Sequence, residues 1–167
     1  MLSMIAKLLK VLNSEADPFQ ISVALGLSMI TGFLPLFTPL NLLILLLVLV
    51  LRVNISSYLL GSAFFAGIAW FLDPIFHRIG LAVLTAGALE GSWTALYNTV
   101  LGRLQRFNNS VVMGSVIFSA LFFVPLVLLL NIAIRKYRDH VLLWVKKTRF
   151  MQILMASKFY DLYEKLS

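Results

Sequence analysis

Apolar residues along the chain gather into five long runs, which occupy residues 18–34, 39–51, 55–72, 74–89 and 111–134. Three of the runs begin with a proline that directly follows a polar residue, at Asp17-Pro18, Thr38-Pro39 and Asp73-Pro74. Such a pair typically starts a helix, because the polar side chain accepts hydrogen bonds from free backbone N–H groups and proline needs no acceptor. The pattern predicts five helices in one domain that extends over residues 14–134.

The first two runs are too short for ordinary membrane helices. They hold 17 and 13 residues, whereas a helix that crosses the hydrocarbon layer needs about 20. Pro35, Thr38 and Pro39 form the turn between them, and Pro35 ends the first helix because it has no N–H. We therefore expect a proline-broken helical hairpin. It either re-enters the bilayer or makes two thin spans, and the length of the second run favours re-entry.

The three remaining runs differ in how well they fit a membrane span. Residues 55–72 and 111–134 are long and uncharged, so we expect at least two full spans. The fourth run carries His77 and Arg78, which favours a helix at the membrane interface. The stretch 90–109 mixes polar and aromatic residues, which is typical of a helix or loop at the membrane surface, where Trp and Tyr are enriched.

Both ends of the chain have the pattern of amphipathic helices. In residues 1–13 the apolar residues fall on one helical face beside two lysines, and we expect a helix that lies on the membrane surface. Residues 135–167 hold 8 of the 14 basic residues against 3 acidic ones, a net charge of +5. The positive-inside rule predicts a cytoplasmic tail, which contacts anionic lipid head groups or docks a partner. With both termini on that side, the number of crossings is even.

Composition strengthens the membrane interpretation. Hydrophobic residues make up 60% of the 167-residue chain and charged residues 13%, with a mean hydropathy of +0.94, whereas a soluble domain has about 25% charged residues. These values exclude a disordered chain and most soluble enzymes. The net charge of +7 would indicate nucleic acid in a soluble protein, but here the basic residues flank membrane segments, so we expect no nucleic acid. The predicted fold class is an all-α, polytopic integral membrane protein.

Residues that could carry chemistry are few. The chain has no cysteine and two histidines, and no metalloprotease, serine-hydrolase or phosphate-loop motif occurs in it. We therefore expect no enzyme activity, no metal and no cofactor. Ionisable residues at membrane depth are candidate sites by default. Arg52 and Arg78 are the candidate contacts for lipid or another anion, while Asp17 and Asp73 are expected to be helix caps, with buried acids as the alternative.

Small residues recur at helical spacing in two of the runs. They are Ala24, Ser28 and Gly32 in the first run and Ser57 and Gly61 in the third. A four-residue spacing places small side chains on one helix face and lets two helices approach closely. We expect these residues to form a helix–helix contact that supports the hairpin.

Four short motifs occur together between residues 17 and 74. They are Asp17-Pro18-Phe19 with Ala24-Leu25-Gly26, then Gly32-Phe33-Leu34-Pro35, Arg52-Val53-Asn54 and Asp73-Pro74. This combination resembles a bacterial family of small inner-membrane proteins known as a domain of unknown function, although that family has Asn in place of Asp73. Phe107-Asn108-Asn109-Ser110 is similar to a subgroup from marine gammaproteobacteria, which the chain resembles over nearly its whole length. The resemblance implies a location in the bacterial inner membrane and a larger periplasmic partner of the lipid-bridge type.

The broken hairpin, the scarcity of charge at depth and the two arginines predict the function. We expect a non-enzymatic inner-membrane protein that binds or helps to move phospholipid, as a subunit of a lipid-transport assembly. The hairpin followed by a span is also similar in architecture to half of a DedA-type lipid scramblase, but the acidic hairpin signature is missing. Two alternatives stay open: a structural anchor for a partner protein, and a small-solute or ion transporter built as a homo-oligomer.

Overall fold

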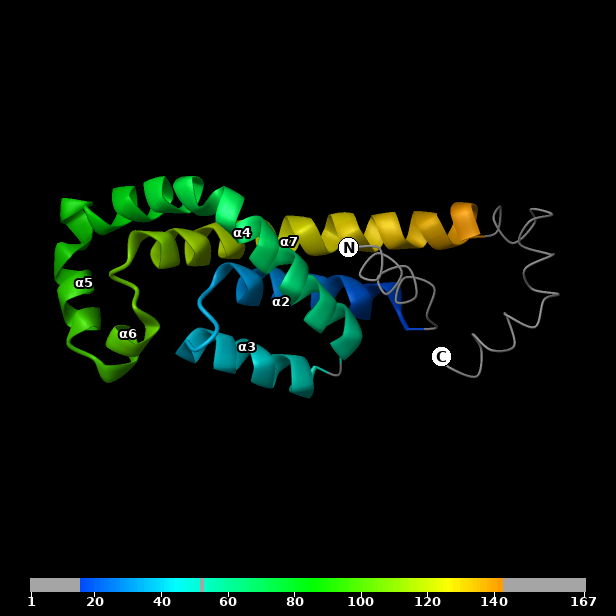
Figure 1. The fold of residues 1–167 in the computed structure, drawn as a ribbon, viewed down its shortest axis with the longest axis horizontal. Helices are drawn as coiled ribbons and strands as arrows, with labels where there is room; N and C mark the ends of the chain where they lie inside the picture. Colours follow the sequence, from blue (N-terminus) through cyan, green and yellow to red (C-terminus); the bar gives the residue numbers. More distant parts are fainter. Residues whose placement is uncertain (1–15, 52, 143–167) are drawn as a thin grey trace. The chain divides into compact units, whose positions relative to one another are not determined.

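The computed structural model describes residues 16–51 and 53–142, and helices are the only regular elements within those ranges. The elements are α2 (Pro18–Phe33), α3 (Pro39–Val50), α4 (Ile55–Leu84), a 3-10 turn η1 (Gly87–Leu89), α5 (Glu90–Tyr97), α6 (Val100–Gln105), α7 (Ser110–Lys136) and a π-helical turn η2 (Tyr137–Leu142) (Figure 1). The expected all-α class is confirmed for this part of the chain. The expected surface helix at 1–13, most of the basic tail and Arg52 lie outside the described residues.

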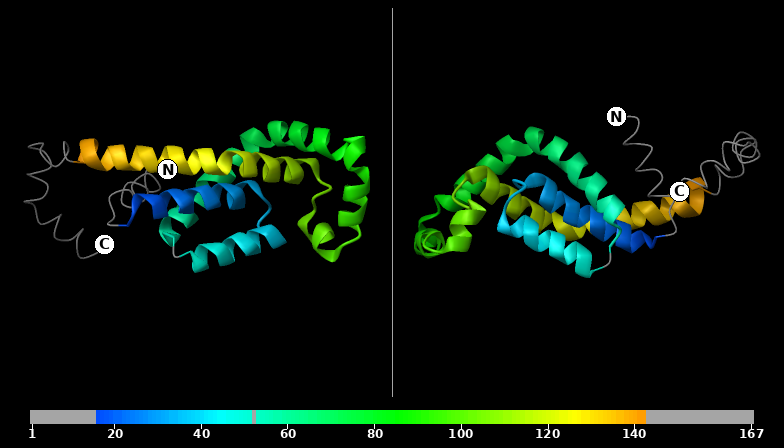
Figure 2. Two further views of the ribbon diagram at one scale, coloured as in Figure 1. Left: turned by 180° about the vertical axis from the view of Figure 1, so that it is seen from behind. Right: turned by 60° about the horizontal axis from the view of Figure 1, so that its bottom comes forward.

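The chain forms two compact units, Met1–Asn131 and Ile132–Ser167, with the boundary inside α7. The described part of the second unit consists of the end of α7 and η2. The first unit contains α2 to α6 and most of α7, and Figure 2 shows its helices from two further directions.

The two helices of the hairpin begin where the cap-plus-proline signal predicts. The carboxylate of Asp17 accepts a hydrogen bond from the Phe19 N–H at 2.8 Å. The hydroxyl of Thr38 accepts one from the Asn41 N–H at 3.4 Å. A proline follows each cap and needs no acceptor for its nitrogen. Because α2 stops at Phe33, shortly before Pro35, the predicted break between the two helices is confirmed.

The same signal at Asp73-Pro74 does not start a helix, and the prediction of separate helices over 55–72 and 74–89 is wrong. Helix α4 continues through Pro74 for 30 residues. Asp73 is therefore a half-buried residue inside a helix and not a cap. A proline in a helix interior costs about 3 kcal/mol and bends the helix, and α4 curves along its length (Figure 2). Phe76, two residues after the proline, is completely buried, and the van der Waals packing of its ring favours the continuous helix.

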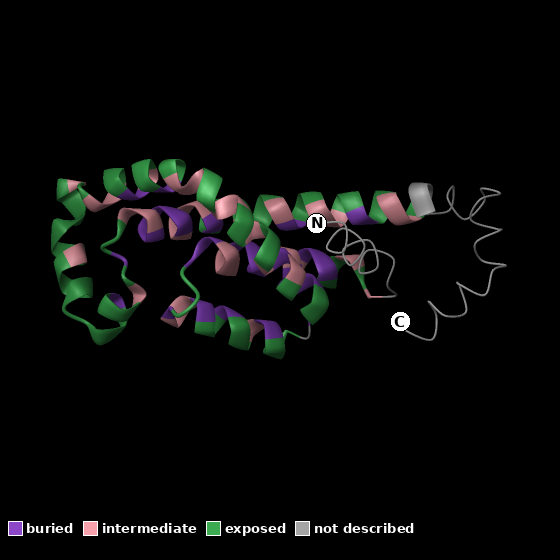
Figure 3. Ribbon diagram, in the orientation of Figure 1, coloured by how far each residue is buried: buried purple, intermediate pink, exposed green. Residues whose placement is uncertain are grey.

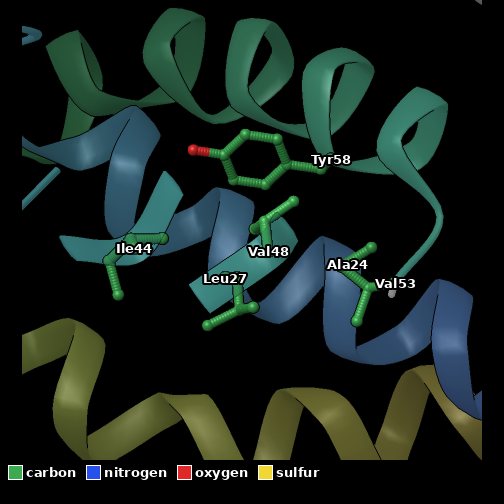
Figure 4. Packing of buried hydrophobic residues seen from close by; sticks show 6 residues of the cluster. All are labelled: Ala24, Leu27, Ile44, Val48, Val53 and Tyr58. Carbon is green, nitrogen blue, oxygen red and sulfur yellow. The ribbon is translucent and has the colours of Figure 1, made fainter. Parts of the chain in front are cut away.

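Helix α2 is the central helix of the first unit, with α4 on one side and α7 on another (Figure 4). A core cluster joins α2 to α3 and α4, and it consists of Ala24, Leu27, Ile44, Val48, Val53 and Tyr58. A second cluster surrounds Phe33, whose ring centroid lies 5.1 Å from that of Phe76 and 6.1 Å from that of Phe118. The end of α2 therefore lies beside the middle of α4 and the first half of α7.

Small residues lie where the helices meet at four of the five predicted positions. Gly61 of α4 contacts Ser28 of α2, and a Cβ at Gly32 would lie 2.9 Å from the Ser62 carbonyl oxygen. Ala24 lies in the core cluster between α2, α3 and α4. Ser57 has a different role, because its hydroxyl donates to the Oδ1 of Asn54 at 2.8 Å as part of the N-cap of α4.

Helices α4 and α7 approach each other more closely than α2 and α4 do, and the sequence pattern does not predict this contact. A Cβ at Gly80 would overlap the backbone carbonyl of Ser110, and a Cβ at Gly114 would overlap that of Phe76. Glycine is required at both positions because backbone cannot move aside as a side chain can. The His77 imidazole Nδ1 lies 2.6 Å from the Ser110 hydroxyl at the same crossing.

Within the described ranges, two helices are long and apolar enough to cross a membrane, judged by length and composition: Ile55–Leu84 and Ser110–Asp139. The helices of the hairpin are shorter. With a rise of about 1.5 Å per residue, α2 is about 24 Å long and α3 about 18 Å. The stretch 90–109, expected as a surface helix or loop, forms α5 and α6. Many outward-facing residues on these helices are exposed (Figure 3).

Candidate functional site

The first unit contains an apolar pocket of about 660 Å³, called here the α6 pocket. Its lining comes from four helices and the loop before α7: Pro39, Leu40, Leu42, Leu43 and Leu46; Trp93 and Leu96; Leu101, Gly102 and Gln105; Phe107; and Val112, Met113 and Val116. The volume falls within the range of about 300–1,000 Å³ that is typical of ligand pockets. Nearly all of the lining is hydrocarbon, so the pocket fits a flexible apolar ligand.

Local signals position the short helix α6 against this pocket. The Thr99 hydroxyl accepts a hydrogen bond from the Gly102 N–H at 3.0 Å and caps the helix. Gly102 packs so closely on α5 that a Cβ there would overlap the Leu96 carbonyl. Arg106 ends the helix in the left-handed conformation, with φ of 56°. This conformation is unusual for a residue other than Gly, Asn or Asp and turns the chain toward α7.

Gln105 links α6 to the hairpin. Its Oε1 accepts a hydrogen bond from the Leu40 N–H at 3.0 Å, and this N–H belongs to the first turn of α3, where no helical partner exists. The Nε2 of the same amide is buried and has no hydrogen-bond partner in the described structure. Gln105 is therefore a lining residue with one satisfied and one unsatisfied polar group.

The turn of the hairpin has an apolar tip and an organised polar interior. Leu36 is 76% exposed and Phe37 is 98% exposed. Beneath them, the buried Asn41 donates from Nδ2 to the Pro35 carbonyl at 2.8 Å, with longer contacts of 3.5 Å to the carbonyls of Thr31 and Leu36. The turn thus satisfies its backbone groups from its own side chains.

Sequence reasoning missed Asn41, Gln105 and the aromatic wall made by Trp93 and Phe107. A signal for Asn41 was present, because it is the only polar residue between Pro39 and Leu51. A side-chain amide in so apolar a helix needs internal partners. No comparable signal marks Gln105, whose partner lies 65 positions earlier in the chain.

The ionisable residues singled out from the sequence do not converge on one site within the described residues. Asp17 is an exposed helix cap, and Arg78 is exposed on α4 and absent from the pocket lining. Asp73 and His77 lie one turn apart on α4 without an ion pair between them. Residues 16–51 and 53–142 also contain no cluster of His, Asp and Glu that could hold a metal.

A second apolar pocket, of about 570 Å³, lies between α2, α3 and α7. Its lining includes Phe19, Leu27, Leu47, Phe123 and Val127, and no polar atom is exposed in it. The first unit therefore offers two hydrocarbon-lined cavities, but only the α6 pocket has a lining residue with an unsatisfied hydrogen-bond donor.

Comparisons with known proteins give one relative and no activity. The chain is 24% identical over 141 residues to a protein of Treponema pallidum (strain Nichols) described as "Uncharacterized protein". The match covers 84% of this chain and 87% of that protein, so the likeness extends over nearly the whole length of both. No protein-family model matches the chain. No solved structure matches it either.

Proposed function

We propose that the protein is a polytopic integral membrane protein that binds phospholipid and helps to move it, with one acyl chain in the α6 pocket. The observation that carries the proposal is the pocket itself, a cavity of about 660 Å³ whose lining is almost entirely hydrocarbon. An acyl chain matches such a lining because it makes van der Waals contacts with it and has no hydrogen-bonding groups along its length.

Exposure along the long helices supports a membrane environment. In the most apolar 18-residue windows of the two candidate spans, 11% and 17% of the residues are buried. The core helix of a soluble protein would be mostly buried, whereas a membrane helix faces lipid. On α3, Leu45, Leu49 and Val50 are also exposed, and they line neither of the two pockets. Soluble proteins rarely expose large contiguous apolar patches.

The hairpin formed by α2 and α3 is proposed to re-enter the bilayer with its tip inside the hydrocarbon layer. Both helices are shorter than the hydrocarbon thickness of about 30 Å. Phe33, next to the turn, contacts Phe118, which lies eight residues after the start of α7 at Ser110. This separation corresponds to about 12 Å along the uncharged part of α7. The apolar tip and the hydrogen bonds from Asn41 suit this depth, where backbone groups cannot reach water.

The orientation follows from charge and from the family resemblance. The basic tail favours cytoplasmic termini, and α5 and α6, with Trp93, Tyr97 and two arginines, suit the opposite interface. A location in the bacterial inner membrane and a larger periplasmic partner in a lipid-transport assembly are the parts of the proposal that depend on the resemblance. No observation on the described residues favours the anchor or the solute transporter, since a transporter would place polar groups along a path at mid-depth.

Pocket filling tests lipid binding. Val116→Trp places a large side chain in the α6 pocket, whereas Leu121→Trp adds the same side chain on an exposed position of α7 that lines neither pocket. We expect purified wild-type protein and Leu121→Trp to retain phospholipid through detergent extraction and to accelerate movement of a labelled phospholipid in liposomes. Val116→Trp should lose both properties. Absence of bound lipid and of lipid movement in the wild type would refute the proposal.

Cysteine labelling tests the hairpin. Because the chain has no native cysteine, Phe37→Cys provides a single reactive thiol at the most exposed residue of the tip. We expect membrane-impermeant maleimides to label it slowly from either side of an intact membrane and rapidly after detergent addition. Gly87→Cys, in the turn after α4, is the comparison and should label from one side. Rapid labelling of Phe37→Cys from one side would indicate two thin spans.

A further inference from the structure

We propose that the lipid of the α6 pocket is an anionic, ester-linked phospholipid: Arg103 and Arg106 bind its phosphate, and the Gln105 amide donates to its acyl carbonyl. This inference rests on the proposed function and names the substrate class of the same site. It is carried by the order of polar and apolar groups along α6.

The residues of α6 alternate between the pocket and its outer side. Leu101, Gly102 and Gln105 line the pocket, and Phe107 continues the lining after the helix ends. Arg103 and Arg106 lie between these positions in the sequence, and both are exposed. Each guanidinium is thus carried by a residue adjacent to one that lines an apolar cavity. A phospholipid has the matching arrangement, with a charged phosphate next to hydrocarbon.

The charge around α6 favours an anion. In the described structure no ion pair or side-chain hydrogen bond neutralises Arg103 or Arg106. The chain contains no acidic residue between Glu90 and Asp139. The planar guanidinium donates paired hydrogen bonds to phosphate oxygens, which makes arginine well suited to this group.

Gln105 contributes the third part of the proposed lipid site, a hydrogen-bond donor. Its Nε2 is buried beside the pocket and has no acceptor, while its Oε1 is held by the Leu40 N–H. A buried donor without an acceptor disfavours the empty state, so a ligand that brings an oxygen gains from filling it. In a diacyl phospholipid the ester carbonyls lie between phosphate and hydrocarbon, and Gln105 is a polar lining residue that directly precedes Arg106 in the sequence.

The test uses Trp93, which lines the pocket and is held by a hydrogen bond from its Nε1 to the Val83 carbonyl at 3.1 Å. Replacing Trp70 and Trp144 with Phe leaves Trp93 as the only tryptophan in the full-length chain. This protein is reconstituted in bilayers that contain phosphatidylglycerol or phosphatidylcholine with brominated acyl chains. Bromine quenches tryptophan fluorescence on contact, so mixtures of the two lipids report their relative affinity for the pocket.

We expect both lipids to quench Trp93, with a preference for phosphatidylglycerol of about fivefold for each arginine. In the variant Arg103→Gln with Arg106→Asn the preference should fall toward one while quenching persists; Asn is chosen because it tolerates the left-handed conformation of residue 106. Arg135→Gln with Lys136→Gln, in the last turn of α7, removes the same two charges and is the charge-matched control, which should keep the wild-type preference.

The carbonyl contact is tested with an ether-linked phosphatidylglycerol, which has the same charge but no ester carbonyl. The wild type should bind the ester-linked lipid about fivefold more tightly, and Gln105→Met should abolish this difference. The comparison of the two lipids on the wild type decides the point even where the variant does not fold.

The outcomes separate the two proposals. Absence of quenching by every brominated lipid would refute lipid binding in the pocket as a whole. Quenching by both head groups with equal affinity, an unchanged preference in the double arginine variant, or equal affinity for ester- and ether-linked lipid would overturn the assignment made here and leave lipid binding intact.

Discussion

A substitution of Gly80 by Ala tests the close contact between α4 and α7. A Cβ at this position would overlap the backbone carbonyl of Ser110, so the two helices have to move apart. Gly67 offers a matched control in the same helix, because a Cβ there would have no heavy atom within 4 Å. The two substitutions are chemically identical and differ in what surrounds them.

The magnitude follows from two terms. Replacing a helical glycine by alanine stabilises the helix by about 1 kcal/mol at either position. Overpacking at a rigid contact costs about 1–3 kcal/mol, and it applies to Gly80 alone. Gly67→Ala should therefore raise the free energy of unfolding by about 1 kcal/mol. Gly80→Ala should be less stable than Gly67→Ala by about 1–3 kcal/mol, a difference from which the helix-propensity term cancels.

Reversible unfolding by SDS in mixed micelles, followed by far-UV circular dichroism, measures both free energies. Gly114→Ala should behave like Gly80→Ala, because its Cβ would overlap the Phe76 carbonyl at the same crossing. In the double variant the second substitution should cost less than the first, since the helices are already displaced. Equal stability of Gly80→Ala and Gly67→Ala would refute the close approach of α4 to α7.

Two further substitutions test the caps and the turn. Asp17→Ala should lower the free energy of unfolding by about 1 kcal/mol, because the Phe19 N–H loses its acceptor. Asp73→Ala, inside α4, should change this free energy little. Equal losses of unfolding free energy for the two variants would contradict the continuous helix. Asn41→Leu removes the hydrogen bond to the Pro35 carbonyl and the unpaired Oδ1 together, so we expect a net loss of about 1 kcal/mol. Its control is Asn98→Leu, at an exposed position without a side-chain hydrogen bond in the described structure, which should unfold like the wild type. If Asn98→Leu lost as much unfolding free energy as Asn41→Leu, the hydrogen bonds in the turn would not explain the effect.

The local signals that the sequence contains determine where the hairpin begins and ends. At Asp17-Pro18 and Thr38-Pro39 the backbone N–H groups of a first helical turn need acceptors, and the preceding side chain provides one within two or three residues. Pro35 separates the two helices because its ring and missing N–H act on its immediate neighbours. The short lengths of α2 and α3 follow directly from the positions of these residues.

The candidate site could be predicted only in part. The apolar character of residues 39–51 and the aromatic stretch 90–109 were visible, but their meeting in one pocket was not, because the lining extends from Pro39 to Val116. Arg52 and Arg78 are recognisable as candidates from the sequence, because they are charged residues in apolar surroundings. Gln105 is not, because the feature that distinguishes it is a hydrogen bond to a distant backbone group.

The sequence by itself determined helical structure, the break at Pro35 and the strongly apolar character of the chain. Tertiary structure decided the rest, as Asp73-Pro74 shows. The pair has the same local chemistry as Asp17-Pro18, yet α4 continues through it, because Phe76 and Gly80 pack against α2 and α7 on the far side of the proline. A cap and a proline make a helix start favourable over one turn, whereas the van der Waals packing of a whole aromatic side chain and of a close helix contact outweighs a single lost hydrogen bond.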